Sequence, residues 1–381
     1  MKNTNDYLII SAIDPTRAYS CIKYLYRTLL LDNKKVECWC NVPKKNMKSY
    51  KEWGENTYSF CNSFLCLIPK VRSWHMHFVG FLNCLKFRNS NIICHDLFHY
   101  KTCLIIKKFF PKTKIILYFT EIYNSKHSSY LRKLQEYFEK HSNDMDLMIE
   151  CDFKRQEYRV KQNGVEKPSS TILNTIPFTE VNDILKIERK KNEKPIVVFS
   201  GGVHEPGEFS IIIDALKEIN IDYELIFYCF GNKNVLDSLN NECEEKINGK
   251  FKLITNKSRE EVLHDIRSAD VGIVYYDPDY SINTRFAAPT KFFEYVSLGI
   301  PVMSSGNESL INIIDEHGLG EYMKSNDVIG MKNGLLKLLS SEAYREEISK
   351  NETKSFRDCL CYEVQSKEAI NMIESISKKG S

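Results

Sequence analysis

The stretch NTRFAAPTKFFEYVSLGIPVMSSG, from Asn283 to Gly306, decides how the second half of this chain is built. It reads as a flexible polar loop, a short helix that begins at Pro289, a stop at Gly299 and a strand from Ile300 to Met303. Proline suits the first position of a helix, and glycine suits the position just beyond its end. The stretch therefore predicts one αβ step of an α/β fold.

Two charged side chains share one face of that helix, because Lys291 and Glu294 are three residues apart. Phe292, Phe293 and Val296 can bury the other side. A cation, a helix N-terminus and a carboxylate on one edge suit a nucleoside diphosphate, with phosphates at Lys291 and ribose hydroxyls at Glu294. The alternative is an ordinary αβ unit with a lysine and a glutamate on its surface.

The motif resembles the nucleotide-sugar signature of GT-B glycosyltransferases, and specifically that of the group 1 (GT4-like) retaining enzymes of bacterial polysaccharide biosynthesis. The positions that match Pro-x-Lys-x-x-Glu-Tyr-x-x-x-Gly-x-Pro-Val are Pro289, Lys291, Glu294, Tyr295, Gly299, Pro301 and Val302. The resemblance extends back to about Pro195, and from there to the N-terminus mainly as the order of elements. It implies an α/β protein of the GT-B fold, with two facing doubly wound Rossmann-like domains and an active site in the interdomain cleft.

The resemblance also implies where the donor binds. The expected donor-binding residues are Gly201, Gly202, Gly231, Asn256, Arg285, Pro289, Thr290, Lys291 and Glu294. Gly201 and Gly202 follow the strand PIVVFS and lack the dinucleotide pattern Gly-x-Gly-x-x-Gly, so NAD is not expected. From the residues alone they fit a tight βα turn; in the family this loop faces the donor diphosphate.

The sequence departs from the family pattern in two places. Many relatives carry an arginine and a lysine soon after the paired glycines, but GGVHEPGEFS, from Gly201 to Ser210, has neither. We therefore expect Lys291, helped by Arg285, to supply the positive charge. Retaining members often have two glutamates eight positions apart, and here the first of these positions holds Phe286.

The N-terminal half is expected to bind the acceptor. His95 and Asp96 end one predicted strand and Glu121 ends another, so both would lie at the same edge of a parallel sheet. Glu121 can hydrogen-bond a sugar hydroxyl, and Arg17 could pair with an acceptor phosphate, although a solvated arginine is the alternative. A lone histidine such as His95 is more often structural. The expected catalytic residues are Glu121, Lys291 and His95, and the expected acceptor-binding residues are Arg17 and Glu121.

The composition indicates an enzyme of ordinary two-domain size, with 381 residues of which 43% are hydrophobic. Its formal net charge of +3 gives no sign of nucleic-acid binding. We find neither a spanning apolar run nor a signal peptide at the start MKNTNDYLII. Thirteen scattered cysteines favour reduced thiols, so we expect a cytoplasmic protein. Cys38-x-Cys40 and Cys359-x-Cys361 lack zinc spacing and are taken as structural.

The segment from Lys70 to Arg88 combines a basic character with an amphipathic pattern. Its apolar residues at helical spacing are Trp74, Phe78, Phe81, Leu82 and Leu85, and its flanking cations are Lys70, Arg72, Lys86 and Arg88. Such a helix can lie in a membrane surface, which would place the protein at the inner face of the plasma membrane. The alternative is a helix whose apolar face covers the core.

Strand and helix patterns alternate along the chain, which predicts parallel sheets. In the first half we expect strands at 7–11, 36–40, 91–94, 114–119, 147–150 and 171–173, and helices at 19–31 and 128–141. In the second half we expect strands at 195–200, 224–230, 251–255, 270–275 and 300–303. The expected organisation is an acceptor domain at 1–180, a charged linker at 181–194, a nucleotide-sugar domain at 195–355 and a helical segment at 356–381, which could pack back on the first domain.

The resemblance implies a glycosyltransferase that moves a sugar from a nucleotide sugar to a glycan or a lipid-linked saccharide. The resemblance implies retention of anomeric configuration and no need for a metal or cofactor. The only close match to an Asp-x-Asp motif near the signature is Asp277-Pro278-Asp279, which we interpret as a turn. Two alternatives remain open: a nucleotide-sugar epimerase on the same fold, and a catalytically silent GT-B protein that acts as a binding partner.

Overall fold

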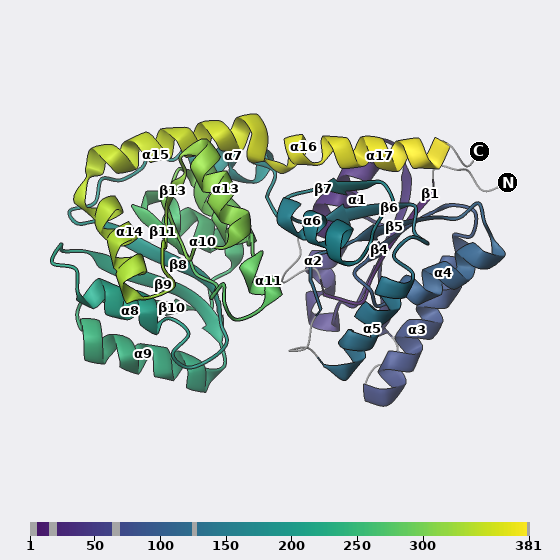
Figure 1. Cartoon of the computed structure of the whole chain (residues 1–381), viewed down its shortest axis with the longest axis horizontal. Helices are drawn as coiled ribbons and strands as arrows, with labels where there is room; N and C mark the ends of the chain where they lie inside the picture. The colour runs from purple at the N-terminus through teal and green to yellow at the C-terminus, as the bar shows by residue number, and fades with distance from the viewer. Residues whose placement is uncertain (1–5, 15–20, 63–68, 124–127, 379–381) are drawn as a thin grey trace. The chain divides into compact units, whose positions relative to one another are not determined.

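The computed structural model of the chain describes residues 6–14, 21–62, 69–123 and 128–378 (Figure 1). The chain divides into two compact units. The first unit comprises Met1–Asn174 together with Gln365–Ser381, and the second comprises Thr175–Val364. Each unit contains one parallel sheet covered by helices.

The first unit has a seven-stranded sheet in the order β3-β2-β1-β4-β5-β6-β7, and all of its paired strands are parallel. Its strands are β1 (Asp6–Ser11), β2 (Lys35–Cys40), β3 (Thr57–Ser59), β4 (Asn91–His95), β5 (Lys114–Tyr118), β6 (Leu147–Glu150) and β7 (Ser169–Thr171). Its helices are α1 (Cys21–Leu31), α2 (Met47–Lys51), α3 (Pro69–Lys86), α4 (Tyr100–Phe109), α5 (Ser129–Lys140), α6 (Phe153–Gln162) and α17 (Lys367–Lys378).

The second unit has a six-stranded parallel sheet in the order β10-β9-β8-β11-β12-β13. Its strands are β8 (Ile196–Val203), β9 (Glu224–Gly231), β10 (Phe251–Thr255), β11 (Val271–Val274), β12 (Val302–Ser304) and β13 (Gly320–Tyr322). Its helices are α7 (Phe178–Leu185), α8 (Ser210–Lys217), α9 (Lys233–Ile247), α10 (Arg259–Asp265), α11 (Ile282–Arg285), α12 (Thr290–Leu298), α13 (Glu308–His317), α14 (Val328–Ser340) and α15 (Glu342–Ser355); α16 (Tyr362–Gln365) follows.

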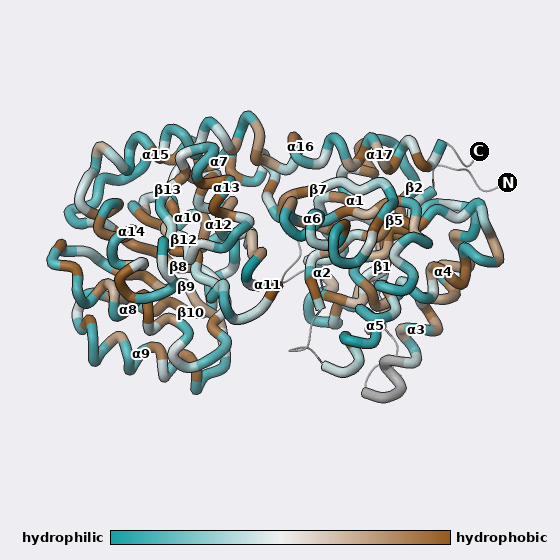
Figure 2. The backbone as a smooth tube through the Cα atoms, viewed as in Figure 1, coloured by the Kyte–Doolittle hydropathy of each residue, from teal (hydrophilic) through white to brown (hydrophobic). Residues whose placement is uncertain are grey.

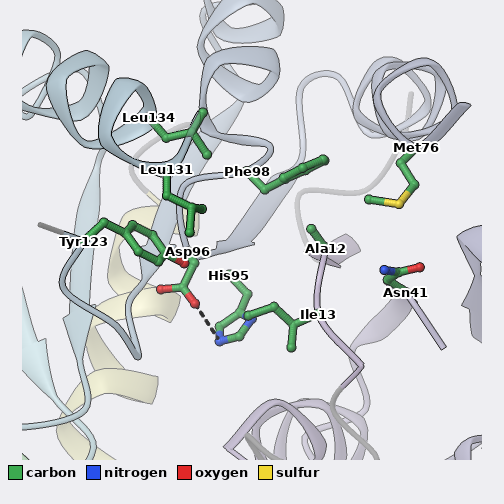
Figure 3. Close-up of a pocket in the computed structure, with 10 residues that line it drawn as sticks. All are labelled: Ala12, Ile13, Asn41, Met76, His95, Asp96, Phe98, Tyr123, Leu131 and Leu134. Atoms are coloured by element: carbon green, nitrogen blue, oxygen red, sulfur yellow. Dashed lines mark ion pairs between the residues drawn. The ribbon is translucent and has the colours of Figure 1, made fainter. Parts of the chain in front are cut away.

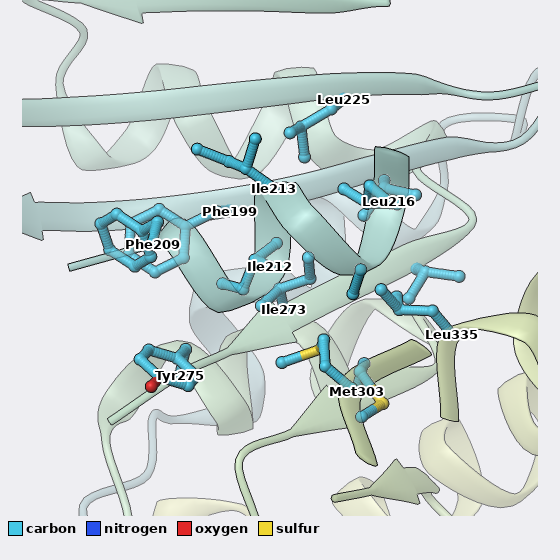
Figure 4. Packing of buried hydrophobic residues seen from close by; sticks show 14 of the residues in the cluster. Phe199, Phe209, Ile212, Ile213, Leu216, Leu225, Ile273, Tyr275, Met303 and Leu335 are labelled. Carbon is cyan, nitrogen blue, oxygen red and sulfur yellow. The ribbon is translucent and has the colours of Figure 1, made fainter. Parts of the chain in front are cut away.

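The core of each unit lies where apolar strands meet the apolar faces of the helices. In the second unit Phe199 of β8 packs against Phe209, and Ile212 and Leu216 of α8 complete the same cluster (Figure 4). Helices that cover the sheets are polar on their outer sides, and α15 is largely hydrophilic in Figure 2. Burial of these apolar faces is the main term that stabilises such a fold.

Two short strands were missed by the sequence interpretation, because three-residue strands carry little pattern. They are β3 and β13, so the second sheet has six strands where we expected five. The expected polar loop at Asn283 is partly helical: Ser281 and Thr284 form a capping box at the start of α11. Ser258 and Glu261 form a capping box at the start of α10.

The domain boundaries differ from the expected ones. Helix α7 and the expected linker belong to the second unit, where Arg189 donates hydrogen bonds to the carbonyls of Ala269 and Gly299. The charged segment therefore packs on the second unit and does not act as a free linker. At the C-terminus, α17 lies with the first unit, where Ser377 Oγ is 3.1 Å from Tyr7 Oη.

Most described cysteines are buried, and none of those that the structure describes forms a disulfide. In the same described ranges, no helix is both long and apolar enough to cross a bilayer.

Helix α3 turns its apolar stripe outward. Trp74, Phe78, Phe81 and Leu82 are exposed, whereas the buried positions of the same helix are Met76, Gly80, Asn83 and Cys84. A Cβ atom at Gly80 would lie 2.6 Å from the His99 ring, so this glycine lets the helix approach the chain after β4 closely. The core-facing alternative is therefore wrong for these four residues, whereas Leu85 packs against the core of the first unit.

Candidate active site

The ends of β8 and β11 form the point in the second unit where the strand order reverses. From β8 the chain proceeds through β9 and β10 on one side, and then through β11, β12 and β13 on the other. Ligands of such sheets bind beyond the carboxyl ends of the strands at this point. Gly201 and Gly202 lie within the last residues of β8, rather than after the strand as expected, and Tyr275 and Tyr276 follow β11.

The ammonium group of Lys291 lies at this point. Its Nζ atom is 3.9 Å from the ring centroid of Phe199 and 5.1 Å from that of Tyr276. The side chain is nine-tenths buried, which excludes the alternative of a lysine on the surface. Within the part of the chain that the structure describes, the ammonium forms no ion pair or hydrogen bond. A buried cation over two aromatic rings can attract an anion strongly, because little water screens it.

Burial also changes the acid–base behaviour of this lysine. Loss of hydration lowers the pKa of Lys291 from 10.5 to about 8, and the charges of Cys229, Glu208 and Glu294 act in the opposite direction. A bound diphosphate would supply the missing counter-charge and raise the pKa again. The site is therefore suited to hold an anionic group.

Other residues of the signature hold the helix in place. The phenol oxygen of Tyr295 accepts a hydrogen bond from the Ser200 backbone N–H at 2.9 Å, so it ties α12 to β8. A Cβ atom at Gly272 would lie 2.5 Å from the Tyr295 ring, so the glycine makes room for it. Gly299 ends α12 in the left-handed conformation, as expected. Pro289 is the extended residue just before the helix, which therefore begins one position later than predicted.

The carboxylate of Glu294 is held by an arginine that the sequence interpretation missed. Arg259 donates from Nε to Oε1 of Glu294 at 2.5 Å and from Nη1 to Oε2 of Glu180 at 2.9 Å. Glu294 is buried, and Arg259 is the first residue of α10. Because one carboxylate accepts several hydrogen bonds, Glu294 can keep this arginine and still accept from a ribose hydroxyl.

The loop after β8 brings a negative charge toward the lysine. The Glu208 carboxylate accepts hydrogen bonds from the backbone N–H groups of His204 and Glu205, at 2.7 and 3.4 Å. In relatives that carry an arginine and a lysine here, this region is positive. In this chain the loop amides are directed to Glu208 instead.

The remaining expected donor residues occupy the same edge of the sheet with different partners. Arg285 pairs with Glu308, so its charge is already balanced, and buried Phe286 follows it. Gly231 ends β9, where a Cβ atom would lie 2.5 Å from the Val203 carbonyl oxygen, and exposed Asn256 follows β10. Thr290 is the first residue of α12.

The loop between β11 and α12 is fixed by Asn307, a second residue that sequence interpretation missed. Its side-chain amide donates to the carbonyls of Tyr276 at 2.9 Å and Thr284 at 2.7 Å. Asp277 and Asp279 both accept from Asn326, and the turn expected at Asp277-Pro278-Asp279 is present.

The first unit has a pocket at the corresponding reversal of its own sheet, beyond β1 and β4. Its volume is about 360 Å³. Figure 3 shows its lining residues: Ala12, Ile13, Asn41, Met76, His95, Asp96, Phe98, Tyr123, Leu131 and Leu134. Most of these side chains are apolar, and among the polar ones Asp96 lies beside His95.

His95 forms a closed hydrogen-bond chain. Its Nδ1 atom lies 2.8 Å from Ser11 Oγ and its Nε2 atom lies 3.1 Å from Thr120 Oγ1, which itself donates to Asp96 Oδ2. Because the threonine hydroxyl donates to Asp96, it accepts from the histidine, which fixes the proton on Nε2. Burial lowers the pKa of His95, so the ring is neutral although Asp96 lies 3.6 Å away. Both ring nitrogens are engaged, which fits a structural role.

Glu121 is half-buried. Two arginines of α6 donate hydrogen bonds to the backbone carbonyls at this position. Arg155 donates to the Thr120 carbonyl at 2.5 Å, and Arg159 donates to the Glu121 carbonyl at 2.7 Å. Arg159 also pairs with buried Glu150. Glu121 therefore sits on a rigid support beside the pocket residue Tyr123. Arg17, the other expected acceptor-binding residue, lies outside the described residues.

Comparison with known proteins identifies the second unit. Residues 180–355 match the sequence model of the family Glycosyl transferases group 1. The second unit therefore carries a glycosyltransferase group 1 domain, and the chain has the GT-B fold. The matched region contains all the donor-binding residues that we predicted, including Lys291 and Glu294. A search of curated proteins finds no match.

Solved structures share the fold of this glycosyltransferase over nearly the whole chain. HepE of Anabaena in complex with UDP has a TM-score of 0.76 at 11% identity, covering 97% of this chain and 100% of its own. Sucrose-phosphate synthase from Thermosynechococcus elongatus has a TM-score of 0.76 at 12% identity, covering 98% and 100%. The lipopolysaccharide outer core galactosyltransferase WaaB has a TM-score of 0.66 at 15% identity, covering 97% and 99%. The likeness confirms the predicted fold.

Proposed function

We propose that this glycosyltransferase transfers a sugar from a nucleotide sugar to a hydroxyl of a glycan or lipid-linked saccharide, in the biosynthesis of cell-surface polysaccharide. The observation that carries the proposal is the buried, unpaired ammonium of Lys291 at the reversal point of the second sheet. When the bond from the sugar to the diphosphate breaks, negative charge develops on the diphosphate. Lys291 and the first amides of α12 would stabilise it.

The donor's ribose would bind at Glu294. Its carboxylate is oriented by Arg259 and retains lone pairs for ribose hydroxyls. HepE, which has a similar fold, has been crystallised with UDP and with UDP-glucose, which supports a donor of this class. Retention of anomeric configuration is proposed by analogy with the group 1 family.

We propose that the reaction needs no metal, because Lys291 offers the positive charge that a cation would otherwise supply. Turnover should then persist in EDTA. Loss of turnover in EDTA that manganese restores would contradict this part of the proposal.

The acceptor would bind at the pocket of the first unit, with Glu121 accepting the hydrogen of the attacking hydroxyl. The apolar lining of the pocket by Met76, Phe98, Leu131 and Leu134 supports an acceptor with an apolar portion, such as a lipid-linked saccharide. We also propose a cytoplasmic location at the inner face of the plasma membrane, with membrane contact through the segment from Lys70 to Arg88.

A screen of nucleotide sugars tests the proposed function. UDP-, GDP- and ADP-linked hexoses are added to the protein, and its thermal midpoint is recorded with each. A ligand present at a hundred times its Kd stabilises the folded state by about 2.7 kcal/mol, which gives a clear shift. One nucleotide should stand out from the others, and its sugar should be transferred or hydrolysed. No shift with any donor would contradict the proposal.

A catalytically silent binding protein is the second candidate, favoured by Glu208. This carboxylate lies where relatives carry cations, and it acts on the charge of Lys291. Glu208→Gln keeps an oxygen acceptor for the loop amides and removes the charge. An enzyme should turn over its donor with either residue, whereas a silent protein should bind a nucleotide and release no diphosphate. No residue that the structure describes favours the epimerase alternative.

A further inference from the structure

The exposed face of α3 joins four large apolar side chains in one stripe. Trp74 is 62% exposed, Phe78 47%, Phe81 37% and Leu82 47%. Their spacing of four, three and one residues places them along one side of the helix. The rings of Trp74 and Phe78 stack with centroids 5.3 Å apart. A stripe of this kind on the outside of a protein indicates a surface that is covered by something else.

The neighbouring helix α4 continues the apolar character. It packs directly against α3, and the two helices lie side by side in Figure 1. Ile105 is 40% exposed and Phe109 is 72% exposed. Helix α3 leads into β4 and α4 leads into β5. Because these neighbouring strands are parallel, the two helices end at the same edge of the sheet, and their C-terminal ends lie near one another. The guanidinium of Arg88 is 5.7 Å from the Phe110 ring, which confirms this closeness.

The same part of the chain is strongly basic. Between Asn56 and Thr120 the sequence has nine lysines and arginines and one acidic residue. The whole chain, by contrast, has 53 lysines and arginines and 50 acidic residues. The acidic residue is Asp96, which is buried and bonded to Thr120. The exposed cations beyond α3 and around α4 include Lys86, Arg88, Lys101, Lys108 and Lys112. Lys86 forms an ion pair with Glu37 of β2, whereas Arg88, Lys101, Lys108 and Lys112 form none with the residues that the structure describes.

From this combination we infer that the α3–α4 face, defined by Trp74, Phe78, Phe81, Leu82, Ile105 and Phe109, docks on an anionic lipid bilayer. The apolar side chains enter the headgroup region, and the surrounding lysines and arginines attract anionic headgroups. Anionic lipid suits this surface better than a protein partner, because exposed cations without an ion-pair partner among the described residues and exposed aromatic side chains occur together.

Membrane docking extends the proposed function, and its role in catalysis rests on that function. Met76 lines the pocket from the same helix that carries Trp74 and Phe78 on its outer side. Docking through α3 would thus bring the pocket close to the lipid surface, where a lipid-linked acceptor is held. Binding to lipid is nevertheless measured without turnover, so it can fail or succeed independently of the transfer reaction.

Vesicle flotation with the full-length protein tests the inference. Vesicles of phosphatidylcholine with about 30% phosphatidylglycerol are compared with vesicles of phosphatidylcholine alone. We expect the wild type to float with the anionic vesicles, to bind neutral vesicles at least tenfold more weakly and to detach as salt rises, since each basic residue near an anionic surface contributes about 1 kcal/mol, or roughly fivefold.

Two variants separate this face from general stickiness. Trp74→Ser combined with Phe78→Ser should lower the partition coefficient at least tenfold. Both side chains are exposed, so the fold should be retained, and circular dichroism checks it. The matched control is Phe153→Ser, which removes a 55% exposed aromatic side chain at the start of α6 and should leave flotation unchanged.

Three outcomes would overturn the inference. The wild type could remain unbound with both kinds of vesicle, the double variant could float like the wild type, or Phe153→Ser could lose binding equally. Sedimentation velocity without lipid adds a fourth: if the double variant turned a wild-type dimer into a monomer, the face would be a contact between copies of the chain.

Discussion

Gly201 of β8 leaves the space that the ammonium of Lys291 occupies. A Cβ atom at Gly201 would lie 2.6 Å from Lys291 Nζ and 3.2 Å from its Cε atom. Gly201 also has a φ of 146°, which side-chain-bearing residues rarely adopt. The two residues are 90 positions apart in the chain, and together they define where the diphosphate is proposed to lie.

Gly201→Ala should therefore displace the lysine and weaken donor binding at least tenfold in a calorimetric titration. It should also destabilise the fold by about 1–3 kcal/mol, because of the strained backbone. Gly249→Ala is the matched control: its φ is 76°, and a Cβ atom there would meet nothing within 4 Å. If both variants lose donor affinity equally, the effect comes from strain and not from Lys291.

Lys291→Met should stabilise the unliganded protein at pH 7. The folded-state pKa of Lys291 is lowered to about 8, so below pH 8 the buried charge is present at its full cost, up to about 3 kcal/mol. Between pH 8 and 10.5 the unfolded chain binds more protons than the folded one, so this cost disappears as pH rises. Denaturant unfolding of both proteins at pH 7 and pH 10 should show a stability difference that shrinks with pH. A difference independent of pH would contradict the burial argument.

Donor affinity should fall as the pH rises above about 8. The diphosphate needs the protonated ammonium, so binding must take up a proton once Lys291 is neutral. The expected weakening approaches tenfold per pH unit. Titrations in two buffers with different heats of ionisation measure the proton uptake directly, and Lys291→Met should abolish it.

Arg259→Gln should raise the KM for the donor several-fold while changing kcat little, since Arg259 orients Glu294 without touching the reacting atoms. Glu294→Gln should weaken donor binding more, by about 1–3 kcal/mol, because buried partners lose a hydrogen bond. Arg285→Gln is the control, as its exposed guanidinium pairs with Glu308 instead. Additive effects of the Arg259 and Glu294 changes would show that the two residues act separately.

Glu121→Gln should lower transfer to the acceptor about a hundredfold and leave nucleotide binding unchanged, if Glu121 assists the attacking hydroxyl. Glu136→Gln, an exposed glutamate on α5, serves as the control. Equal losses in donor binding and transfer would place the effect in the fold instead.

Much of the fold could be predicted because it depends on local patterns. Buried parallel strands such as β8 and β9 contain continuous apolar runs, and the ends of α10 and α12 carry capping residues that act within a few positions. The domain boundary could not be predicted in this way. Arg189 lies in a charged segment typical of linkers, yet it donates to the carbonyls of Gly299, just after α12, and Ala269, just before β11.

The site was predictable in its residues but not in its environment. The spacing of Lys291 and Glu294 follows from the motif, whereas the burial of Lys291 depends on Phe199, which lies far away in the sequence. The partner of Glu294 was missed because nothing near Arg259 marks it as more than a residue of a helix start. The direction of α3 depends on Gly80 and His99 meeting across the core, which periodicity alone does not reveal.

The central claim is that Lys291 stabilises the diphosphate leaving group of a nucleotide sugar. The most direct measurement is the steady-state release of nucleoside diphosphate from the donor identified by the thermal screen, for the wild type and Lys291→Met, with circular dichroism as the folding control. We predict steady release by the wild type and a rate at least a hundredfold lower for Lys291→Met. Equal rates for the two proteins, or no release from any donor by the wild type, would contradict the account.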